Sequence, residues 1–184
     1  PGLVTFFSSF SHAITAFIAC EKDEKKVTNP GNGEEEELIT TVRLIFNYDP
    51  VSLPADTFTF KDIDGPGGLE PTVFDTIKLV TSQNYTVHAE FLNESTAEAE
   101  DITEEILAEA EEHIICYSSS EDDLLITRTD SDGNYEVGLE SSWSSTEASI
   151  GTVTMTLKHQ PDVKDGTCAP GETDVEVVFP FIVQ

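Results

Sequence analysis

Alternating apolar and polar residues predict β-strands through most of the chain after residue 37. In one clear case Val42, Leu44 and Phe46 occupy every second position. The same segments are rich in β-branched and aromatic residues, and Gly, Pro, Asn and Asp separate them. Seven segments fit this pattern: 38–46, 57–61, 76–80, 84–92, 124–127, 151–158 and 174–183. About seven short strands predict a mainly β fold, a single antiparallel Ig-like β-sandwich covering residues 38–184.

One segment has helical spacing instead. Asp101 is suited to be an N-cap residue, and Glu104 stands three positions later, in an arrangement similar to a capping box. Glutamates occupy most of the other positions, so an apolar face is opposed by an acidic one. We therefore expect one inserted amphipathic helix over about residues 101–114. Its apolar stripe consists of Ile102, Ile106, Leu107, Ala110 and Ile114.

The first nineteen residues contain no Lys, Arg, Asp or Glu, and the composition changes abruptly at Cys20. Phe17-Ile18-Ala19-Cys20 is similar to a bacterial lipobox, with an apolar residue three positions before the cysteine and a small residue directly before it. The apolar part is too short to span a membrane. We expect residues 1–19 to be a signal peptide truncated at its N-terminus and Cys20 to be the lipidated first residue of the mature protein. The alternative is a buried N-terminal helix with an ordinary cysteine.

Residues 20–37 differ from both flanking regions, because they combine many charges with Asn, Pro and Gly and end in four consecutive glutamates. Such a composition favours a solvated chain over a packed one. We expect this segment to be an acidic tether between the lipidated cysteine and the folded domain. The lipid would make the membrane a partner of the protein, since each buried methylene contributes roughly 0.8 kcal/mol.

The overall charge narrows the range of partners. The 184 residues include 36 Asp and Glu but nine Lys and Arg, which gives a formal net charge of −27. Nucleic-acid binding needs a basic surface, so we expect no nucleic-acid partner. Electrostatic docking on anionic lipid is disfavoured for the same reason. The chain can still form a hydrophobic core, since 38% of its residues are hydrophobic and eleven are Phe.

An ordered series of sequence blocks resembles a known family. The series begins with Cys20 and the acidic tether and covers nearly the whole predicted mature chain. The blocks are ELITTV (37–42), TFTFKDIDG (57–65), FLNES (91–95), EDITEEI (100–106), EEH (111–113), GTVTMTLKHQP (151–161) and GETDVEV (171–177). Together they resemble small Bacteroidota (flavobacterial) lipoproteins that are often named type 1 periplasmic binding fold superfamily proteins.

The resemblance implies export, lipid anchoring at the outer membrane and an association with TonB-dependent receptors. It carries no catalytic residue over to this chain. The name of that family denotes a two-lobed α/β structure, whereas one helix among about seven strands predicts a β-sandwich. We therefore base the expected cellular location and partner on the resemblance, but not the expected fold.

Histidines and an adjacent acid form one candidate metal site. Glu109 and His113 are four residues apart on the predicted helix and therefore lie on one face. With His159 or His88 they would supply ligands for Zn²⁺ or Cu²⁺. The alternative is a solvated acidic helix face whose terminal His113 interacts with the helix dipole, with His159 as a polar residue facing a turn.

Two turns are candidates for calcium. Asp62 and Asp64 form one pair, and Asp130, Asp132 and Asn134 form a second group. In each turn, oxygen-bearing side chains are two residues apart, as in loops that bind hard cations. Neither turn matches the EF-hand pattern. The alternative is that both are ordinary turns, since Asp, Asn and Gly favour turns without any ion.

The remaining cysteines suggest a cross-link. With Cys20 lipidated, Cys116 and Cys168 are an even number in an exported protein, and a disulfide between them is one interpretation. The other is that Cys116 is a small buried residue. The chain contains no nucleophile elbow, P-loop or Rossmann glycine motif, so we expect a protein that is not an enzyme.

The expected cellular location, the family resemblance and the sequence motifs lead to one expected function and two alternatives. We expect a non-catalytic, lipid-anchored binding protein of the cell envelope, attached to the outer membrane on its periplasmic or surface face and accessory to TonB-dependent uptake. The first alternative is a structural or adhesive surface module stabilised by calcium. The second is a lipoprotein that captures Zn²⁺ or Cu²⁺.

Overall fold

The computed structural model describes residues 38–51, 53–65 and 68–184. The signal peptide, the lipidation of Cys20 and the acidic tether all fall on residues 1–37, so these predictions lie outside the described residues. The chain divides into two units, Pro1–Glu34 and Glu35–Gln184, and the description below concerns the second. In the described part, no helix combines the length and apolar character needed to cross a membrane.

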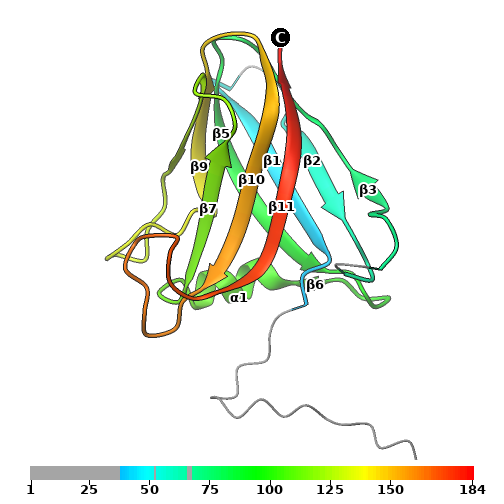
Figure 1. Cartoon of the computed structure of the whole chain (residues 1–184), viewed down its shortest axis with the longest axis vertical. Coiled ribbons are helices and arrows are strands. Elements are labelled where there is room, and N and C mark those ends of the chain that lie inside the picture. The colour runs from blue at the N-terminus through cyan, green and yellow to red at the C-terminus, as the bar shows by residue number, and fades with distance from the viewer. Residues whose placement is uncertain (1–37, 52, 66–67) are drawn as a thin grey trace, which may run out of the picture. The chain divides into compact units, whose positions relative to one another are not determined.

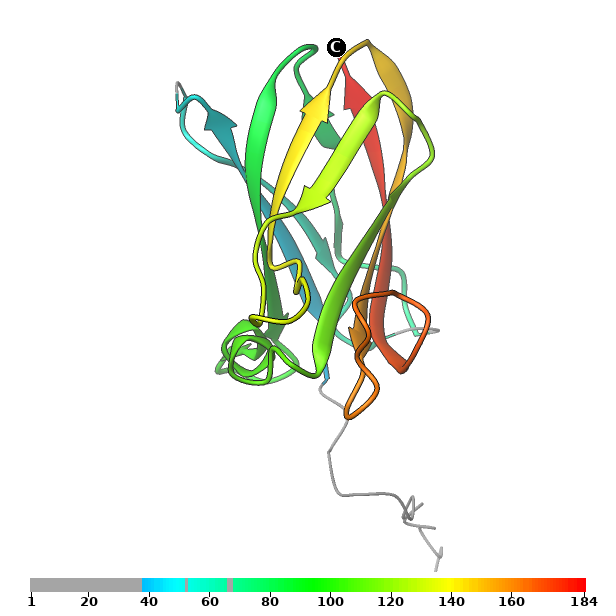
Figure 2. The same cartoon turned by 90° about the vertical axis from the view of Figure 1, so that its left-hand side faces the viewer.

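Two β-sheets pack face to face (Figures 1 and 2). The first has the strand order β3-β2-β1-β5-β9-β8, and β6 pairs with β5 beside this path. Each pair of adjacent strands in this sheet with a defined register is antiparallel. In the β1–β5 pair, for example, Leu44 lies opposite Ala89. Its strands are β1 (Thr41–Asp49), β2 (Asp56–Lys61), β3 (Val73–Phe74), β5 (Asn84–Asn93), β6 (Glu100–Asp101), β8 (Leu124–Arg128) and β9 (Glu140–Ser145).

The second sheet has the order β4-β11-β10-β7. Its strands are β4 (Ile77–Leu79), β7 (His113–Ser119), β10 (Ser149–His159) and β11 (Glu172–Val183). The two long strands β10 and β11 form its centre and pair antiparallel. The short β4 pairs parallel to the last residues of β11, so this sheet is mixed. The predicted β-sandwich is confirmed, with this parallel pair as the difference from an all-antiparallel arrangement.

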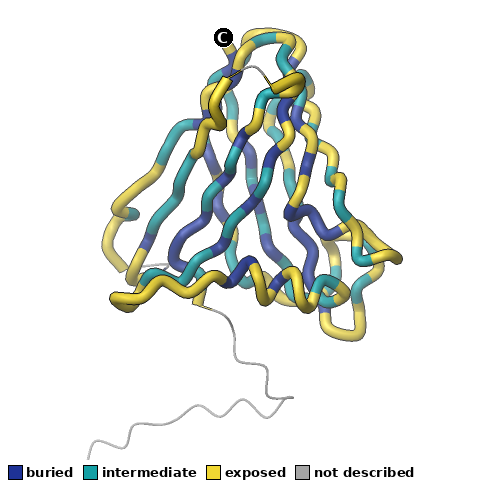
Figure 3. The backbone as a smooth tube through the Cα atoms, turned by 180° about the vertical axis from the view of Figure 1, so that it is seen from behind, coloured by how far each residue is buried: buried dark blue, intermediate teal, exposed yellow. Residues whose placement is uncertain are grey.

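The core lies between the sheets and follows the predicted alternation. Buried residues alternate with less buried ones through part of β1, β5, β10 and β11, and exposed residues collect in the connecting loops (Figure 3). Its largest side chain is Trp143, which is fully buried and contacts Phe46 edge to face with ring centroids 5.1 Å apart. Tyr85 contacts the same Phe46 ring at 5.6 Å. These aromatic contacts join three neighbouring strands of the first sheet.

The helix is shorter than predicted. Asp101 is its N-cap, as expected, because its carboxylate accepts the backbone N–H of Thr103 at 3.0 Å. However, α1 covers Ile102–Ala108, and the prediction that it reaches residue 114 is wrong. His113–Ser119 forms β7 instead, whose first three residues are all buried. Two consecutive isoleucines pack better on both faces of a strand than on the single stripe of a short helix.

Candidate functional site

Two cavities lie in different parts of the sandwich. The end of β2 and the start of β11 line one of them, and β7 and β8 line the other. We call the first the Asp62 cavity and the second the Arg128 pocket, after a charged residue in each. Their volumes are about 540 Å³ and 210 Å³. The larger one falls within the roughly 300–1,000 Å³ usual for small-molecule sites.

The Asp62 cavity combines apolar walls with acidic groups. It contains no Lys or Arg among its lining residues. The apolar members are Leu38, Ile39, Phe60 and Val175, the acidic members are Asp62, Glu172, Asp174 and Glu176, and Gly65 and Thr173 complete the lining. Such a wall can hold a hydrocarbon body while the carboxylates favour positive charge.

Local pairing fixes Asp62 at the end of β2. Its backbone N–H donates to the carbonyl of Thr40 at 2.8 Å, which extends the β1–β2 ladder by one step. The chain then turns through Gly65, whose φ of +74° favours glycine. Asp64 has a different role, since its Oδ2 accepts the N–H of Leu69 at 2.8 Å. Asp62 therefore lines the cavity, whereas Asp64 stabilises the turn.

Asp62 and Asp123 each have a buried carboxylate oxygen without a hydrogen-bond partner, and of these two Asp62 lines the cavity. The residue is 9% exposed, and its Oδ1 is buried without a hydrogen-bond partner. Buried polar groups in proteins are almost always hydrogen-bonded, because an unpaired one loses its interaction with water and gains nothing in return. An unsatisfied carboxylate oxygen in a residue that lines a cavity indicates a place where a donor from a ligand would be stabilised.

A β-bulge shapes the opposite wall of the cavity. In the β10–β11 register Val175 lies opposite Leu157, but Thr173 lies opposite Lys158. Asp174 is therefore an extra residue in β11, and bulges of this kind redirect side chains at the edge of a sheet. The bulge explains how acidic residues 174 and 176 and the apolar Val175 all come to line the same cavity.

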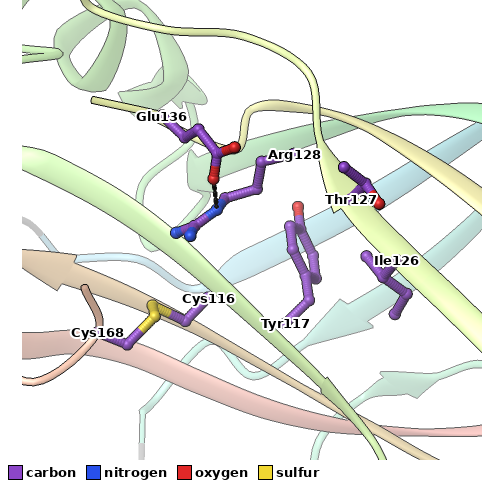
Figure 4. Close-up of a pocket in the computed structure, with 7 residues that line it drawn as sticks. All are labelled: Cys116, Tyr117, Ile126, Thr127, Arg128, Glu136 and Cys168. Carbon is purple, nitrogen blue, oxygen red and sulfur yellow. Dashed lines mark hydrogen bonds and ion pairs between the residues drawn. A yellow bond between two sulfur atoms is a disulfide. The ribbon is translucent and has the colours of Figure 1, made fainter. Parts of the chain in front are cut away.

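The Arg128 pocket differs, because Arg128 and Tyr117 bind other groups of the protein; Figure 4 shows the contact of Arg128 with Glu136. Arg128 donates from Nε to Glu136 Oε2 at 2.9 Å and from Nη1 to the carbonyl of Ile115 at 3.5 Å. The hydroxyl of Tyr117 donates to the carbonyl of Gly138 at 2.9 Å. Burial raises the pKa of that hydroxyl, so it stays protonated. These bonds join β7 to β8 and to the segment before β9, which is a structural role.

A disulfide also lines the Arg128 pocket. Cys116 of β7 is bonded to Cys168 in the loop before β11, with Cα atoms 6.1 Å apart. The structure thus contains the cross-link that was one of the two interpretations of these cysteines. It holds the loop 160–171 against the sandwich and suits an oxidising compartment.

Asp130 and Asp132, the second calcium candidates, bind protein groups instead. Asp130 accepts the backbone N–H of Gly138 at 2.6 Å and of Glu140 at 3.1 Å. Asp132 Oδ2 accepts the ammonium group of Lys164 at 2.6 Å. Its Oδ1 accepts two backbone N–H groups, one of them from Asn134 at 2.7 Å and the other from Tyr135 at 2.8 Å. The lysine therefore stands where the predicted calcium ion would be.

These bonds set the acidity of Asp132. Burial raises its pKa, but the hydrogen bond from Lys164 and those from two backbone N–H groups outweigh burial and lower the pKa to about 2. The side chains of Asp132 and Lys164 are 4% and 3% exposed. Lys164 also donates to the carbonyl of Ala110 at 2.6 Å, so this ion pair joins the turn to the segment after α1.

The histidines come together, though not as ligands of one ion. The rings of His113 and His159 are stacked, with centroids 4.8 Å apart and planes 10° from parallel. Metal-binding lone pairs lie in the ring plane, so two stacked rings direct them along parallel planes and not toward one point. Glu109 contributes its backbone carbonyl, which accepts from His113 Nδ1 at 3.1 Å, and Glu112 lies 3.4 Å from His159 Nε2.

His88 lies on β5 in the other sheet, where its Nδ1 is 2.7 Å from Glu140 Oε1. Burial lowers the pKa of His113, and its bond to the Glu109 carbonyl opposes this effect in part. Within residues 38–51, 53–65 and 68–184, no group of three or more His, Cys, Asp or Glu side chains is arranged to hold a metal ion.

No family model, no curated protein and no solved structure matches this chain. The function proposed below is therefore based on the sequence and on the geometry of the Asp62 cavity. Sequence patterns had indicated Asp62, but they gave no sign of its partners in the wall, because Phe60 and Asp174 lie on strands of different sheets.

Proposed function

We propose that this protein is a non-catalytic, lipid-anchored binding protein of the cell envelope, and that the Asp62 cavity holds its ligand. The observation that carries the proposal is the cavity itself. It has the volume of a small-molecule site, a lining of apolar and acidic residues and a buried carboxylate oxygen without a hydrogen-bond partner. A binding role is favoured over catalysis because Asp130, Asp132 and His113 are engaged in bonds that stabilise the fold.

Export and anchoring have their own support. The Cys116–Cys168 disulfide is typical of proteins that fold outside the cytosol. The lipobox-like residues before Cys20 support attachment through a lipid. The proposed outer-membrane location and the role as an accessory to a TonB-dependent receptor rest on the family resemblance of the sequence blocks.

Metabolic labelling tests the anchor. Cells that produce the natural full-length protein would be grown with an alkyne-bearing fatty acid, and the purified protein would be examined for the label. We expect the wild type to be labelled and to sediment with membranes, and the Cys20→Ala variant to lose both properties. A Cys116→Ala, Cys168→Ala variant is the matched control and should keep the label. Labelling of Cys20→Ala at the wild-type level would contradict the anchor.

Methyl NMR tests the cavity. The purified protein would be titrated with 1-hexanol, a neutral probe that needs only an apolar site. We expect saturable shifts at the methyl groups of Leu38, Ile39 and Val175, which line the cavity. The methyl groups of Ile126, in the Arg128 pocket, serve as the internal control and should not shift. The binding proposal would be overturned if neither 1-hexanol nor hexylammonium shifted the methyl signals of the cavity or of Ile126.

A further inference from the structure

We infer that the ligand of the Asp62 cavity is a small organic cation, a primary ammonium group on a hydrocarbon body, whose ammonium donates to Asp62. This inference rests on the proposed binding function and names the chemical class that the cavity takes. Three features of the cavity support it: the unsatisfied oxygen of Asp62, the sign of the charge around it, and the apolar surface that surrounds both.

The unsatisfied oxygen specifies a hydrogen-bond donor. Asp62 Oδ1 is buried and accepts no hydrogen bond, while the backbone N–H of the same residue is bonded to Thr40. An ionised carboxylate only accepts hydrogen bonds, so the ligand group beside it must donate. A neutral donor would satisfy the oxygen, but a charged donor forms a bond that is shorter and about twice as strong.

The surrounding charge specifies the sign. Glu172, Asp174 and Glu176 line the cavity together with Asp62. Lys61 belongs to β2 and Lys158 to β10, and neither of them lines the cavity. Lys61 pairs with Glu94 Oε2 at 3.0 Å. Lys158 donates from Nζ to the carbonyl of Gly171 and to Thr173 Oγ1 at 2.9 and 3.1 Å. Four acids around one cavity disfavour an anion and favour a cation.

The apolar surface separates an organic cation from a metal ion. A hard cation is usually held by six to eight oxygen ligands, and the described residues contain no suitable group of three or more acidic or histidine side chains. Leu38, Ile39, Phe60 and Val175 would give a hydrated ion nothing to bind. They would bury an alkyl chain, and each methylene removed from water contributes roughly 0.8 kcal/mol. An ammonium group supplies three donors and one positive charge.

Calorimetric titration of the purified protein with three probes of similar size tests the inference. The probes are hexylammonium, 1-hexanol and hexanoate. We expect hexylammonium to bind at least about tenfold more tightly than 1-hexanol, the difference that a hydrogen bond between charged groups provides. Hexanoate should bind more weakly than either. This comparison uses the wild-type protein alone, so it does not depend on whether a variant folds.

Variants then locate the charge. Asp62→Asn keeps the shape of the side chain, and we expect it to lose most of the preference for hexylammonium over 1-hexanol. Asp122→Asn, at an exposed position outside the cavity, is the matched control and should behave as the wild type. Equal binding of hexylammonium and 1-hexanol by the wild type would overturn the cation inference and leave the cavity as an apolar binding site. Binding of none of the probes would overturn the proposed function as well.

Discussion

Asp62 and Asp132 are buried carboxylates in similar turns, but their surroundings are opposite. Asp132 accepts two backbone N–H groups and the ammonium of Lys164. Asp62 lines a cavity, and its buried Oδ1 accepts no hydrogen bond. Both residues drew attention for the same Asp-x-Asp spacing. The difference teaches that spacing identifies a polar turn, whereas the partner of the carboxylate decides whether the turn serves stability or binding.

Removal of the partner of Asp132 is expected to have the largest effect. Lys164→Met would leave a buried carboxylate without its cation, and we expect the free energy of unfolding to fall by about 3 kcal/mol. Urea denaturation at neutral pH measures this change. Lys78→Met, at an exposed position of β4, is the control and should stay within about 0.5 kcal/mol of the wild type. A similarly small effect of Lys164→Met would mean that the ion pair does not stabilise the turn.

Acid should weaken the Asp132–Lys164 ion pair, with a slightly smaller loss of stability than Lys164→Met causes. The pKa of Asp132 is about 2 in the folded protein and 3.8 ordinarily, so its stabilisation is fully present above about pH 4 and is lost as the pH falls through 2. The shift corresponds to about 2 kcal/mol. We expect Asp132→Asn to lose less stability than the wild type between pH 5 and pH 2, when both are followed by urea denaturation.

Other acids titrate over the same interval, so the comparison needs its own control. Asp122→Asn changes an exposed carboxylate and should show the wild-type loss of stability between the two pH values. If Asp132→Asn also lost as much as the wild type, the lowered pKa of Asp132 would be contradicted.

Replacing the carboxylate of Asp62 should change the free energy of unfolding in the opposite direction. In the protein without ligand, Asp62→Asn replaces a charged group with an amide that is less costly to bury. We expect the free energy of unfolding to stay the same or to rise by about 1 kcal/mol. A gain in stability together with a loss of hexylammonium binding would mark Asp62 as a residue kept for function. A decrease of more than about 1 kcal/mol would show instead that Asp62 supports the fold.

Metal removal should have the smallest effect. The carboxylate oxygens of Asp130 and Asp132 accept N–H groups and Lys164, so a chelator has no ion to extract from this turn. We expect the same melting temperature in EDTA and in millimolar calcium, measured by circular dichroism. A rise of several degrees in calcium would favour the alternative of a calcium-stabilised module. The same scan with Zn²⁺ tests the alternative of metal capture by His113 and His159.

The sequence predicted seven of the strands and missed β3, β6, β7 and β9. All seven predicted segments contain a strand. Strand β7 was missed because its first residues, from His113 to Ile115, are buried on both faces and give no period of two. Strand β9 was missed because serine has a low β-propensity, although Ser141, Trp143 and Ser145 do alternate toward the interior.

The candidate site was less predictable than the fold. Asp62 stood out through its neighbours in sequence, but the cavity forms only when the end of β2 meets the start of β11 in the other sheet. That meeting is a property of the topology, and no local pattern encodes it. The role of Lys164 could not be predicted either. A single lysine in a polar loop has the sequence context of a solvated surface residue, and only the fold places it next to Asp132.

Strand β11 has one further consequence for the behaviour of the protein in concentrated solution. Strand β4 pairs with Phe181–Val183 alone, so the outer edge of β11 continues beyond β4. Open strand edges invite pairing with other chains, and such pairing leads to fibrils. Pro180 cannot donate to an added strand, and Glu172 and Glu176 bring like charges together when two copies approach. We therefore expect concentrated solutions to resist amyloid formation even though about half the domain is strand.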